Sequence, residues 1–462
     1  MSAGAARSRR RSRGILRSGS TDIAVPGPLR STTPQEVAIS AFRFVHAADL
    51  HLDSPLRSLA LRDAGLAELV GNATRQAFVR IVDLCLNEQV DALVIAGDLY
   101  DGAQTSMKTA RFLAHELRRL HEAGVRTFII RGNHDALSKI TRELTLPDSV
   151  KLFGARADAV ELARPGERSI RVHGLSFAEP HAPESLLGRY QPPEQEAVNI
   201  GLMHTSLGGC EGHDDYAPCG LADLQRSGFD YWALGHIHRR SVVEGRTAVV
   251  MPGMPQGRDV NEAGPKSVTL VTIRDDRTIH LEERLTSVAE FARVEVDAGH
   301  CDEWPALVRA AGQALETART ACRSPTLIAR LRITGAAPLR WRLRRDLDLL
   351  KAELDEHALS LSGCAVEKLE LELSDAAPEA GLPGDPLAEL GQIIAAQVID
   401  APRFKAQAQE IADELRAQLP PECRALLGVD GAAAEAVLAR FAREGAEEVL
   451  AALREPMRAE PA

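Results

Sequence analysis

The sequence predicts an α/β fold in which buried, mostly parallel strands carry polar side chains at their carboxyl ends. From about residue 42, short apolar runs alternate with amphipathic segments of helical period. Such runs are typical of parallel strands that helices cover on both faces. Five of the runs end in Asp, Asn or His. Because ligands of such sheets bind beyond the carboxyl ends of the strands, these ends predict a functional site.

The first expected strand lies in FRFVHAADLHLD (42–53) and leads into Asp49 and His51. Apolar side chains at helical spacing follow it, and they predict one buried helix face made of Phe78, Ile81, Val82 and Cys85. The DxH pair is weak evidence by itself, because a strand-ending Asp is usually a turn or capping residue.

Two further strands follow, with a helix between them. DALVIAGDLYDG (91–102) is an expected strand that ends at Asp98, and KTARFLAHELRRLHEAG (108–124) is an amphipathic helix closed by a glycine. VRTFIIRGNHDA (125–136) is the next strand, and its end carries Asn133, His134 and Asp135. This end is more specific, because three polar side chains crowd a position where a turn needs only one.

The last two of these strands lie in AVNIGLMHTS (197–206) and FDYWALGHIH (229–238). The first ends at His204. The second carries His236 and His238, which are two residues apart and therefore point the same way in an extended chain. We expect the histidines without this context to be ordinary core or surface residues, namely His46, His115, His121, His173, His280, His300 and His357.

The candidate metal ligands are Asp49, His51, Asp98, Asn133, His204, His236 and His238. Oxygen and imidazole ligands without a thiolate indicate Mn²⁺, Fe²⁺ or Zn²⁺, with Mn²⁺ preferred, and seven ligands suit two ions. Two ions about 3.5–4 Å apart clamp a phosphoester and generate a bridging hydroxide as the nucleophile. Asp98 is the expected bridge because a carboxylate has two oxygens. His134, next to Asn133, is the expected general acid.

The charge of the chain is uneven. Residues 1–40 carry a net charge of +5, which leaves −15 for the remainder of a chain whose total is −10. The Arg/Ser-rich extension at 1–40 is expected to be disordered, because it has almost nothing to bury. The acidic remainder argues against a broad electrostatic surface for nucleic acid, so any DNA contact has to be local.

The length of 462 residues favours two or three domains. The seven cysteines are scattered and never spaced as CxxC, which favours a reducing, cytoplasmic location over a structural zinc site or disulfides. No run of eighteen apolar residues occurs, so no membrane-spanning helix is expected.

The ordered motifs DLH, GDLYD, GNHD, GLMH and GHIH resemble those of the calcineurin-like metallophosphoesterase superfamily over about residues 42–280. The resemblance implies a four-layer α-β-β-α sandwich. It also implies two metal sites that share Asp98. One would be completed by Asp49, His51 and His238, and the other by Asn133, His204 and His236. His134 would be the proton donor.

Three segments resemble the YhaO-type bacterial DNA-repair exonucleases, relatives of the SbcD nuclease subunit. They are HAADLHLDSPL (46–56), YAPCGLADLQRSGFDYWALGHIH (216–238) and MPGMPQGRDVNEAGPKSVTLV (251–271). This likeness shifts the expected activity from a general phosphatase to a DNA exonuclease. The structural alternative for the third segment is a Gly/Pro loop that closes the second sheet.

Some nucleases of this group carry a second active-site histidine where this chain has Asp101, which puts the full exonuclease rate in question. Asp101 could orient His134 or a metal ligand. Asp135 is a similar candidate for orienting the site. His213 is a candidate contact to the phosphate or leaving group, although a structural loop residue is the simpler interpretation.

Beyond the catalytic part, the sequence of residues 291–373 predicts the order strand, helix, strand, helix, strand. This pattern resembles the small α+β capping domain of SbcD-like proteins. The second helix is expected over LRWRLRRDLDLLKAELDEHA. Around Trp341 it carries the local candidates for DNA contact, Arg340, Arg342, Arg344 and Arg345. A solvated helix face with a buried Trp is the equally weighted alternative.

The expected divisions of the chain are 1–40 (extension), 41–285 (catalytic domain), 286–373 (capping domain), 374–386 (linker) and 387–462 (helical region). Helices are expected at about 387–418 and 431–455, in a region that carries a net charge of −8 over residues 374–462. In the resembling family such helices dock on a coiled-coil, SMC-like ATPase, which implies this partner. An Ala-rich appendage is the alternative, and a homodimer is left open.

Three functions are therefore weighed. The leading one is a two-metal DNA exonuclease in DNA repair. The second is a metallophosphoesterase acting on nucleotides, small phosphoesters or phosphoproteins. The third is a non-catalytic scaffold of the same fold, which is disfavoured because scaffolds lose ligands and every expected ligand is present here.

Overall fold

The structure is a computed structural model of the chain. It describes residues 41–54, 71–100, 106–136, 145–163, 167–208, 216–335, 339–373, 386–419, 424, 426–428 and 431–453. The N-terminal extension, Asp101 and His213 lie outside the described residues, as does the expected linker apart from its last residue.

The first sheet is built around β1 (Ala41–Ala47), which contains the first predicted strand. Its order is β12-β11-β1-β2-β3-β4, and β1 to β4 run parallel while β11 pairs antiparallel with β1. The other strands are β2 (Ala92–Ala96), β3 (Arg126–Ile130), β4 (Val150–Leu152), β11 (Ser267–Arg274) and β12 (Ile279–Leu285). β2 is buried at every position, as its continuous apolar sequence predicts.

The second sheet has the order β5-β6-β7-β8-β10-β9, with β6, β7, β8 and β10 parallel. Its strands are β5 (Asp158–Leu162), β6 (Ile170–Gly174), β7 (Val198–His204), β8 (Tyr231–Gly235), β9 (Ser241–Val243) and β10 (Ala248–Met251). β7 and β8 contain the two predicted strands that carry histidines at their ends.

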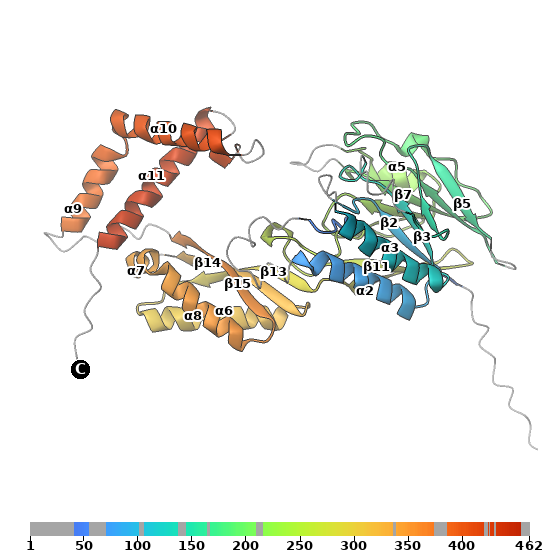
Figure 1. The fold of residues 1–462 in the computed structure, drawn as a ribbon, viewed down its shortest axis with the longest axis horizontal. Helices are drawn as coiled ribbons and strands as arrows, with labels where there is room; N and C mark the ends of the chain where they lie inside the picture. The colour runs from blue at the N-terminus through green and yellow to red at the C-terminus, as the bar shows by residue number, and fades with distance from the viewer. Residues whose placement is uncertain are drawn as a thin grey trace, which may run out of the picture. The chain divides into compact units, whose positions relative to one another are not determined.

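The two sheets pack face to face, and helices cover their outer faces. Between the sheets, the ring of Phe44 in β1 meets the ring of Tyr231 in β8 edge-on at 5.3 Å. Helices α2 (Ala73–Asn87) and α3 (Met107–Glu122) pack side by side on the first sheet (Figure 1). On the second sheet, α5 (Leu221–Arg226) packs through Leu224 near Trp232. The predicted four-layer α-β-β-α sandwich is confirmed.

His46 is a core residue, as predicted. It is fully buried, its Nδ1 lies 2.9 Å from the Tyr231 hydroxyl, and its Nε2 lies 3.1 Å from the Leu234 carbonyl oxygen. Because the carbonyl can only accept, Nε2 carries the proton and the tyrosine hydroxyl donates to Nδ1. Burial lowers the pKa of His46 to about 3, so the ring is neutral at pH 7.

The third sheet is the small parallel sheet β13-β14-β15. Its elements are β13 (Ala289–Asp297), α6 (Trp304–Ala321), β14 (Thr326–Gly335), α7 (Arg340–Arg345), α8 (Leu347–Ser360) and β15 (Cys364–Leu373). The single helix expected over LRWRLRRDLDLLKAELDEHA is wrong, because it divides into α7 and α8. Asp346 leaves the helical region there, with φ −109° and ψ 28°, and its carboxylate accepts hydrogen bonds from Arg345.

The C-terminal elements are α9 (Pro386–Ile393), a π-helical turn (Ile394–Val398), α10 (Pro402–Gln418) and α11 (Gly431–Leu453). The region expected to be helical at 387–418 is helical over most of its length, with a break before Pro402. Proline lacks the N–H that a continuing helix needs, and it therefore opens α10 instead. Among the described residues, no helix combines the length and apolar character needed to cross a membrane.

Candidate metal centre

The predicted ligands come from the carboxyl ends of strands in two different sheets. Asp49, Asp98 and Asn133 follow β1, β2 and β3 of the first sheet. His204 is the last residue of β7, and His236 follows β8 in the second sheet. Since the two sheets pack face to face, five strand ends supply one shared site.

The backbone turns sharply at four of these ligands. Asp49, His51 and Asp98 have φ values of 53°, 41° and 53°, and His236 has a φ of 102°. Residues with side chains rarely adopt this left-handed region, and strained positions of this kind cluster at functional sites. Two backbone hydrogen bonds hold the turns together, from the Asp49 N–H to the Gly97 carbonyl and from the His51 N–H to the Asp98 carbonyl, both 3.1 Å long.

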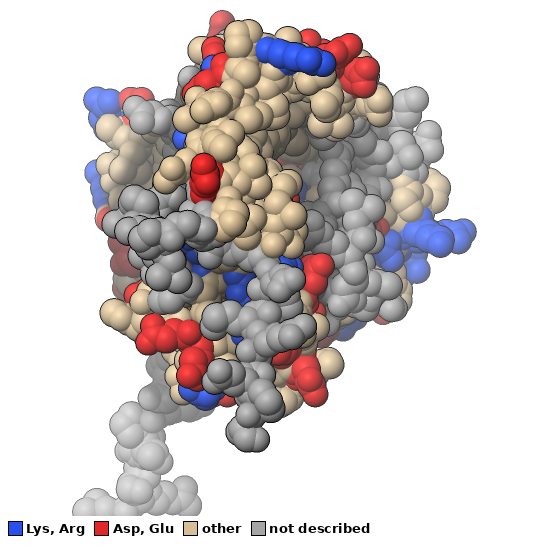
Figure 2. Space-filling model, turned by 90° about the vertical axis from the view of Figure 1, so that its left-hand side faces the viewer, with Lys and Arg blue, Asp and Glu red and all other residues tan. Residues whose placement is uncertain are grey.

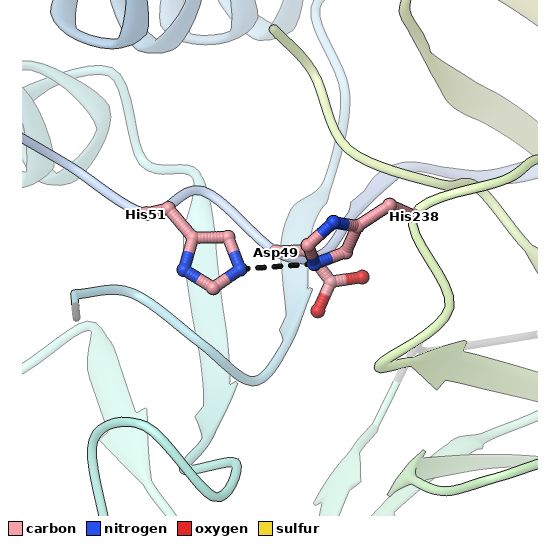
Figure 3. A group of neighbouring side chains, drawn as sticks. All are labelled: Asp49, His51 and His238. Carbon is pink, nitrogen blue, oxygen red and sulfur yellow. Dashed lines mark hydrogen bonds between the residues drawn. The ribbon is translucent and has the colours of Figure 1, made fainter. Parts of the chain in front are cut away.

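The first ligand group consists of Asp49, His51 and His238 (Figure 3). Nε2 of His51 lies 3.1 Å from Nε2 of His238, and both rings point toward the carboxylate of Asp49. Asp49 and His51 are fully buried. One ligand atom from each residue lies within 4.8 Å of the others, which is the spacing of a metal site.

Behind this group lies a carboxylate that was not among the predicted site residues. Oε1 of Glu262 lies 2.8 Å from Nδ1 of His238 and accepts its hydrogen bond. Arg258 donates to the same carboxylate from Nη2, at 2.7 Å. Glu262 belongs to the PQGRDVNEAGPK segment that the YhaO-type resemblance singled out, and that is the signal in the sequence that could have pointed to it.

The second ligand group consists of Asp49, Asp98 and His204, with Asn133 beside it. Nε2 of His204 lies 3.0 Å from Oδ1 of Asn133 and 3.4 Å from Oδ2 of Asp98. The other ring nitrogen, Nδ1, donates to the Ala96 carbonyl at 2.9 Å, which leaves the Nε2 lone pair free to face a metal. Oδ2 of Asp98 also lies 3.9 Å from His51 Nε2, so this carboxylate faces both groups, as a bridging ligand must.

His236 adjoins both groups. Its backbone N–H donates to both carboxylate oxygens of Asp49, at 3.0 and 3.1 Å. Its ring lies 5.1 Å from the His204 ring and 5.2 Å from the Tyr216 ring, in edge-on arrangements. His236 thus lies beside His204 and His238 beside His51, but the extended geometry expected for this pair is wrong, because β8 ends at Gly235 and His236 has a φ of 102°.

The electrostatics of the site favour bound cations. Burial raises the pKa of Asp49 above its usual range, against the opposing effect of His204 and His238. For Asp98, the neighbouring His204 and His51 outweigh burial and lower its pKa. The same carboxylates raise the pKa of His204 to about 9 although burial opposes this. These buried groups are therefore stabilised by nearby positive charge, which divalent metals would supply.

Glycines make room for the ligands. A Cβ on Gly132 would overlap Oδ1 of Asp98 and lie 2.7 Å from the His204 ring. A Cβ on Gly97, which has a φ of +97°, would lie 2.5 Å from Nδ1 of His204. The glycines of GDLYD and GNHD thus allow the two sheets to approach closely at the site.

His134 and Asp135 follow the ligand candidate Asn133, and the first is exposed while the second is buried. The His134 side chain is exposed, its ring lies 5.1 Å from the His51 ring, and its N–H donates to Asp98. Asp135 is fully buried and accepts from the N–H groups of Gly132 and Leu99, which holds the GNHD and GDLYD loops together. Burial and the charge of Asp98 raise the pKa of Asp135 to about 7.

The four arginines predicted to contact DNA lie in α7, and each of them contacts a carboxylate or an aromatic ring. Arg344 forms an ion pair with Glu447 of α11, and Arg345 forms one with Asp346. Arg342 lies over the Trp304 ring at 4.6 Å, and Arg340 lies over the Trp341 ring at 4.7 Å. Arg342 also forms an ion pair with Asp346, at 3.4 Å between Nε and Oδ2.

Two family patterns match this chain. The family described as "Calcineurin-like phosphoesterase" matches residues 42–240, and "Metallophosphoesterase YhaO, middle domain" matches residues 291–374. Fold and site define a metallophosphoesterase, a hydrolase of the calcineurin-like class whose members bind a dimetal centre. Over 315 residues the chain is 32% identical to the "Uncharacterized metallophosphoesterase YhaO" of Bacillus subtilis (strain 168), covering 68% of this chain and 75% of that protein. The chain belongs to the YhaO family of metallophosphoesterases.

More distant relatives are also similar. The "DNA double-strand break repair protein Mre11" of Sulfurisphaera tokodaii is 27% identical over 227 residues, which cover 47% of this chain and 54% of that protein. Among solved structures, a dimetal phosphatase from Danio rerio aligns with a TM-score of 0.33 and 14% identity, covering 53% of this chain and 98% of that one.

Proposed function

We propose that this protein is a two-metal DNA exonuclease that acts in DNA repair. The observation that carries the proposal is the convergence of two ligand groups, which share Asp49, at the ends of strands from both sheets. Asp98 of the second group also faces His51 of the first, at 3.9 Å. The similarity to proteins named for DNA double-strand break repair supports DNA as the substrate. The name of the Bacillus subtilis relative describes it as a metallophosphoesterase and gives no substrate.

Residues of both sheets would hold the metals. Asp49, His51 and His238 would hold one ion, and Asn133, His204 and His236 the other, with Asp98 between them. Two divalent ions, Mn²⁺ in preference to Fe²⁺ or Zn²⁺, would neutralise the phosphate and lower the pKa of a bound water. Geometry supports this division, because His204 Nε2 faces Asn133 and His51 Nε2 faces His238 Nε2.

His134 would protonate the leaving oxygen. Its side chain is exposed next to the buried ligand His51, while its backbone N–H is fixed on Asp98. A histidine in this position can reach a bound substrate without itself being a ligand. Asp135 would hold the loop that carries it, through the hydrogen bonds to Gly132 and Leu99.

Contact with DNA outside the metal centre is proposed for α7. Arg340 and Arg342 are its best candidates, because Arg344 and Arg345 already pair with carboxylates. Arg342 also lies 3.4 Å from Asp346, a weaker contact, and 44% of its side chain is exposed. Phosphate contacts of this kind position DNA without reading its sequence.

An SMC-like coiled-coil ATPase is the proposed partner of α9, α10 and α11. These helices and the π-helical turn between α9 and α10 expose large apolar side chains, namely Ile393, Val398, Ile411, Leu415, Phe441, Val449 and Leu453. In Figure 2, charged side chains gather along the top edge of this face, while the surface just below that edge carries few of them. Exposed apolar positions on helices suit a helical partner.

The deciding experiment measures degradation of linear DNA by the purified protein with Mn²⁺. We expect the wild type to degrade DNA and His134→Ala to lose this activity while still binding two metals. His115→Ala is the matched control, because His115 lies on α3 with 68% of its side chain exposed, and it should leave the rate unchanged. Hydrolysis of small phosphoesters with intact DNA would contradict the nuclease proposal.

The same experiment tests the second candidate, a phosphoesterase that acts on nucleotides, small phosphoesters or phosphoproteins. The observation that bears on this candidate is a cavity of ≈ 230 Å³, although none of the predicted metal ligands lines it. It is lined in part by Phe177, Leu186 and Arg189, and the ring of Phe177 lies 5.6 Å from the ring of the ligand His204. Activity on nucleotides but not on DNA would establish this alternative.

A further inference from the structure

We infer that Glu262 is a positioning residue that fixes the ring of His238 and thereby sets the metal affinity of the Asp49, His51 and His238 group. Its carboxylate does not belong to that group. It acts through the histidine, from the side of the ring that faces away from the other ligands. The inference rests on one part of the proposed function, namely that a metal binds to the group of Asp49, His51 and His238.

The tautomer of His238 follows from its two neighbours. Nδ1 donates to Oε1 of Glu262 at 2.8 Å, while Nε2 lies 3.1 Å from Nε2 of His51. A neutral imidazole carries one N–H, so a carboxylate on Nδ1 leaves the lone pair on Nε2, on the side where His51 and Asp49 converge (Figure 3). A carboxylate behind a ligand histidine also makes the ring a stronger donor to the metal.

Arg258 holds the Glu262 carboxylate in place. The backbone N–H of Arg258 donates to Oε2 at 2.8 Å, Nε donates to Oε2 at 3.2 Å, and Nη2 donates to Oε1 at 2.7 Å. Nη1 of the same guanidinium donates to the Ser54 hydroxyl at 3.3 Å, in the loop that carries His51. The Glu262 carboxylate thus accepts hydrogen bonds from His238 and from three groups of Arg258.

The backbone under Glu262 is equally constrained. Glu262 ends the short 3₁₀ helix η2 (Val260–Glu262), whose first turn is capped by the side chain of Asp259. Immediately before this segment, the buried amide of Gln256 accepts from the Val288 N–H and donates to the Ala289 carbonyl, both at 2.8 Å. Gly257 lies so close to η2 that a Cβ there would lie 2.7 Å from the Glu262 carbonyl oxygen.

These contacts distinguish a positioning role from chance proximity. The carboxylate has a fixed backbone and a fixed guanidinium partner, and only 13% of its side chain is exposed. Of its two oxygens, Oε1 accepts from His238 and Arg258, and Oε2 accepts from Arg258. Loss of the carboxylate would leave the His238 ring free to rotate or to change its tautomer.

The test is a titration of the full chain with Mn²⁺, read as the affinity and number of bound ions. We expect Glu262→Ala to weaken one of the two sites by about 10- to 100-fold and to leave the other unchanged. Glu262→Gln keeps the shape and an acceptor for Nδ1 without the charge, so its loss should be smaller. Asn261→Ala is the matched control, because Asn261 lies in η2 but contacts Arg293 instead of the metal site.

Unchanged Mn²⁺ affinities in both Glu262 variants would overturn the inference. An equal loss of affinity at both metal sites in Glu262→Gln would also overturn it, provided that this variant unfolds at the same temperature as the wild type. Since no DNA is present, a failure of the nuclease proposal cannot affect this outcome. A wild-type chain that binds a single Mn²⁺ would refute the two-metal proposal. An unchanged affinity for that ion in Glu262→Gln would then refute the role of Glu262 as well.

Discussion

His204 donates a hydrogen bond from Nδ1 to the carbonyl oxygen of Ala96 at 2.9 Å, and the two residues belong to different sheets. The last residue of β7 is thus tied to the last residue of β2 at the metal centre. The geometry of the ligands therefore depends on how closely the two sheets approach each other.

Gly132→Ala should disrupt this approach. The added Cβ would overlap Oδ1 of Asp98 and lie 2.7 Å from the His204 ring, and both of these candidate ligands are buried. Because neither can move away without leaving the site, we expect loss of at least one bound Mn²⁺ and of hydrolysis. The bound metal is measured by elemental analysis after dialysis.

Gly154→Ala is the control for this prediction. Gly154 lies in the same domain, and a Cβ there meets nothing within 4 Å. We expect it to keep both metals and the wild-type rate. If Gly132→Ala binds metal as the control does, the packing around Asp98 is looser than the structure indicates.

Removal of either histidine of the GHIH motif should empty mainly one metal site. His238 belongs to the group of Asp49 and His51, while the ring of His236 lies beside His204. We expect His238→Ala and His236→Ala each to bind one Mn²⁺ with nearly wild-type affinity and the second much more weakly. Calorimetric titration gives both affinities, and loss of both ions in either variant would contradict separate sites.

The strands and their polar ends could be predicted because both are local in sequence. An apolar run of four to seven residues followed by Asp, Asn or His identified β1, β2, β3, β7 and β8. The division of the ligands between two metals was not local. It came from the family resemblance, because no spacing along the chain shows that β7 faces β2 across two sheets.

Other features were beyond the sequence for physical reasons. Nothing in the composition of η2 shows that Glu262 accepts from His238, since the contact joins residues 24 positions apart and depends on tertiary packing. The break at Asp346 interrupts a stretch of good helix formers and depends on how its carboxylate meets Arg345. By contrast, the break before α10 could have been predicted from the sequence, because Pro402 is a known helix breaker.

DNA affinity should depend on salt less steeply when a phosphate contact is lost. If Arg340 and Arg342 each neutralise one phosphate, Arg340→Gln and Arg342→Gln should each reduce the slope of log K against log salt by roughly 0.9. Arg226→Gln is the control, because this arginine of α5 is 76% exposed and pairs only locally with Asp223. Binding of a labelled duplex at several salt concentrations measures the slopes, and equal slopes in all variants would remove α7 from the DNA interface.

The buried His46 should make stability depend on pH. Its folded-state pKa is about 3, and its usual value is 6.5, so the unfolded chain binds more protons between these values. The stabilisation from the neutral ring is therefore complete above pH 6.5 and is lost as the pH falls toward 3. Since one proton contributes about 1.4 kcal/mol per pH unit, the loss at pH 5 is about 2 kcal/mol.

Comparison with His46→Gln isolates this effect from other titrating groups. The variant has no ring to protonate, although at pH 8 it should be less stable because the hydrogen bonds to Tyr231 and Leu234 are perturbed. Urea unfolding of both metal-free proteins at pH 8 and pH 5 gives the two free energies of unfolding. We expect the stability advantage of the wild type to shrink by about 2 kcal/mol at pH 5. A constant difference would show that water reaches the ring and keeps the folded-state pKa of His46 near its usual value, and that the sheets are less tightly closed behind Asp49.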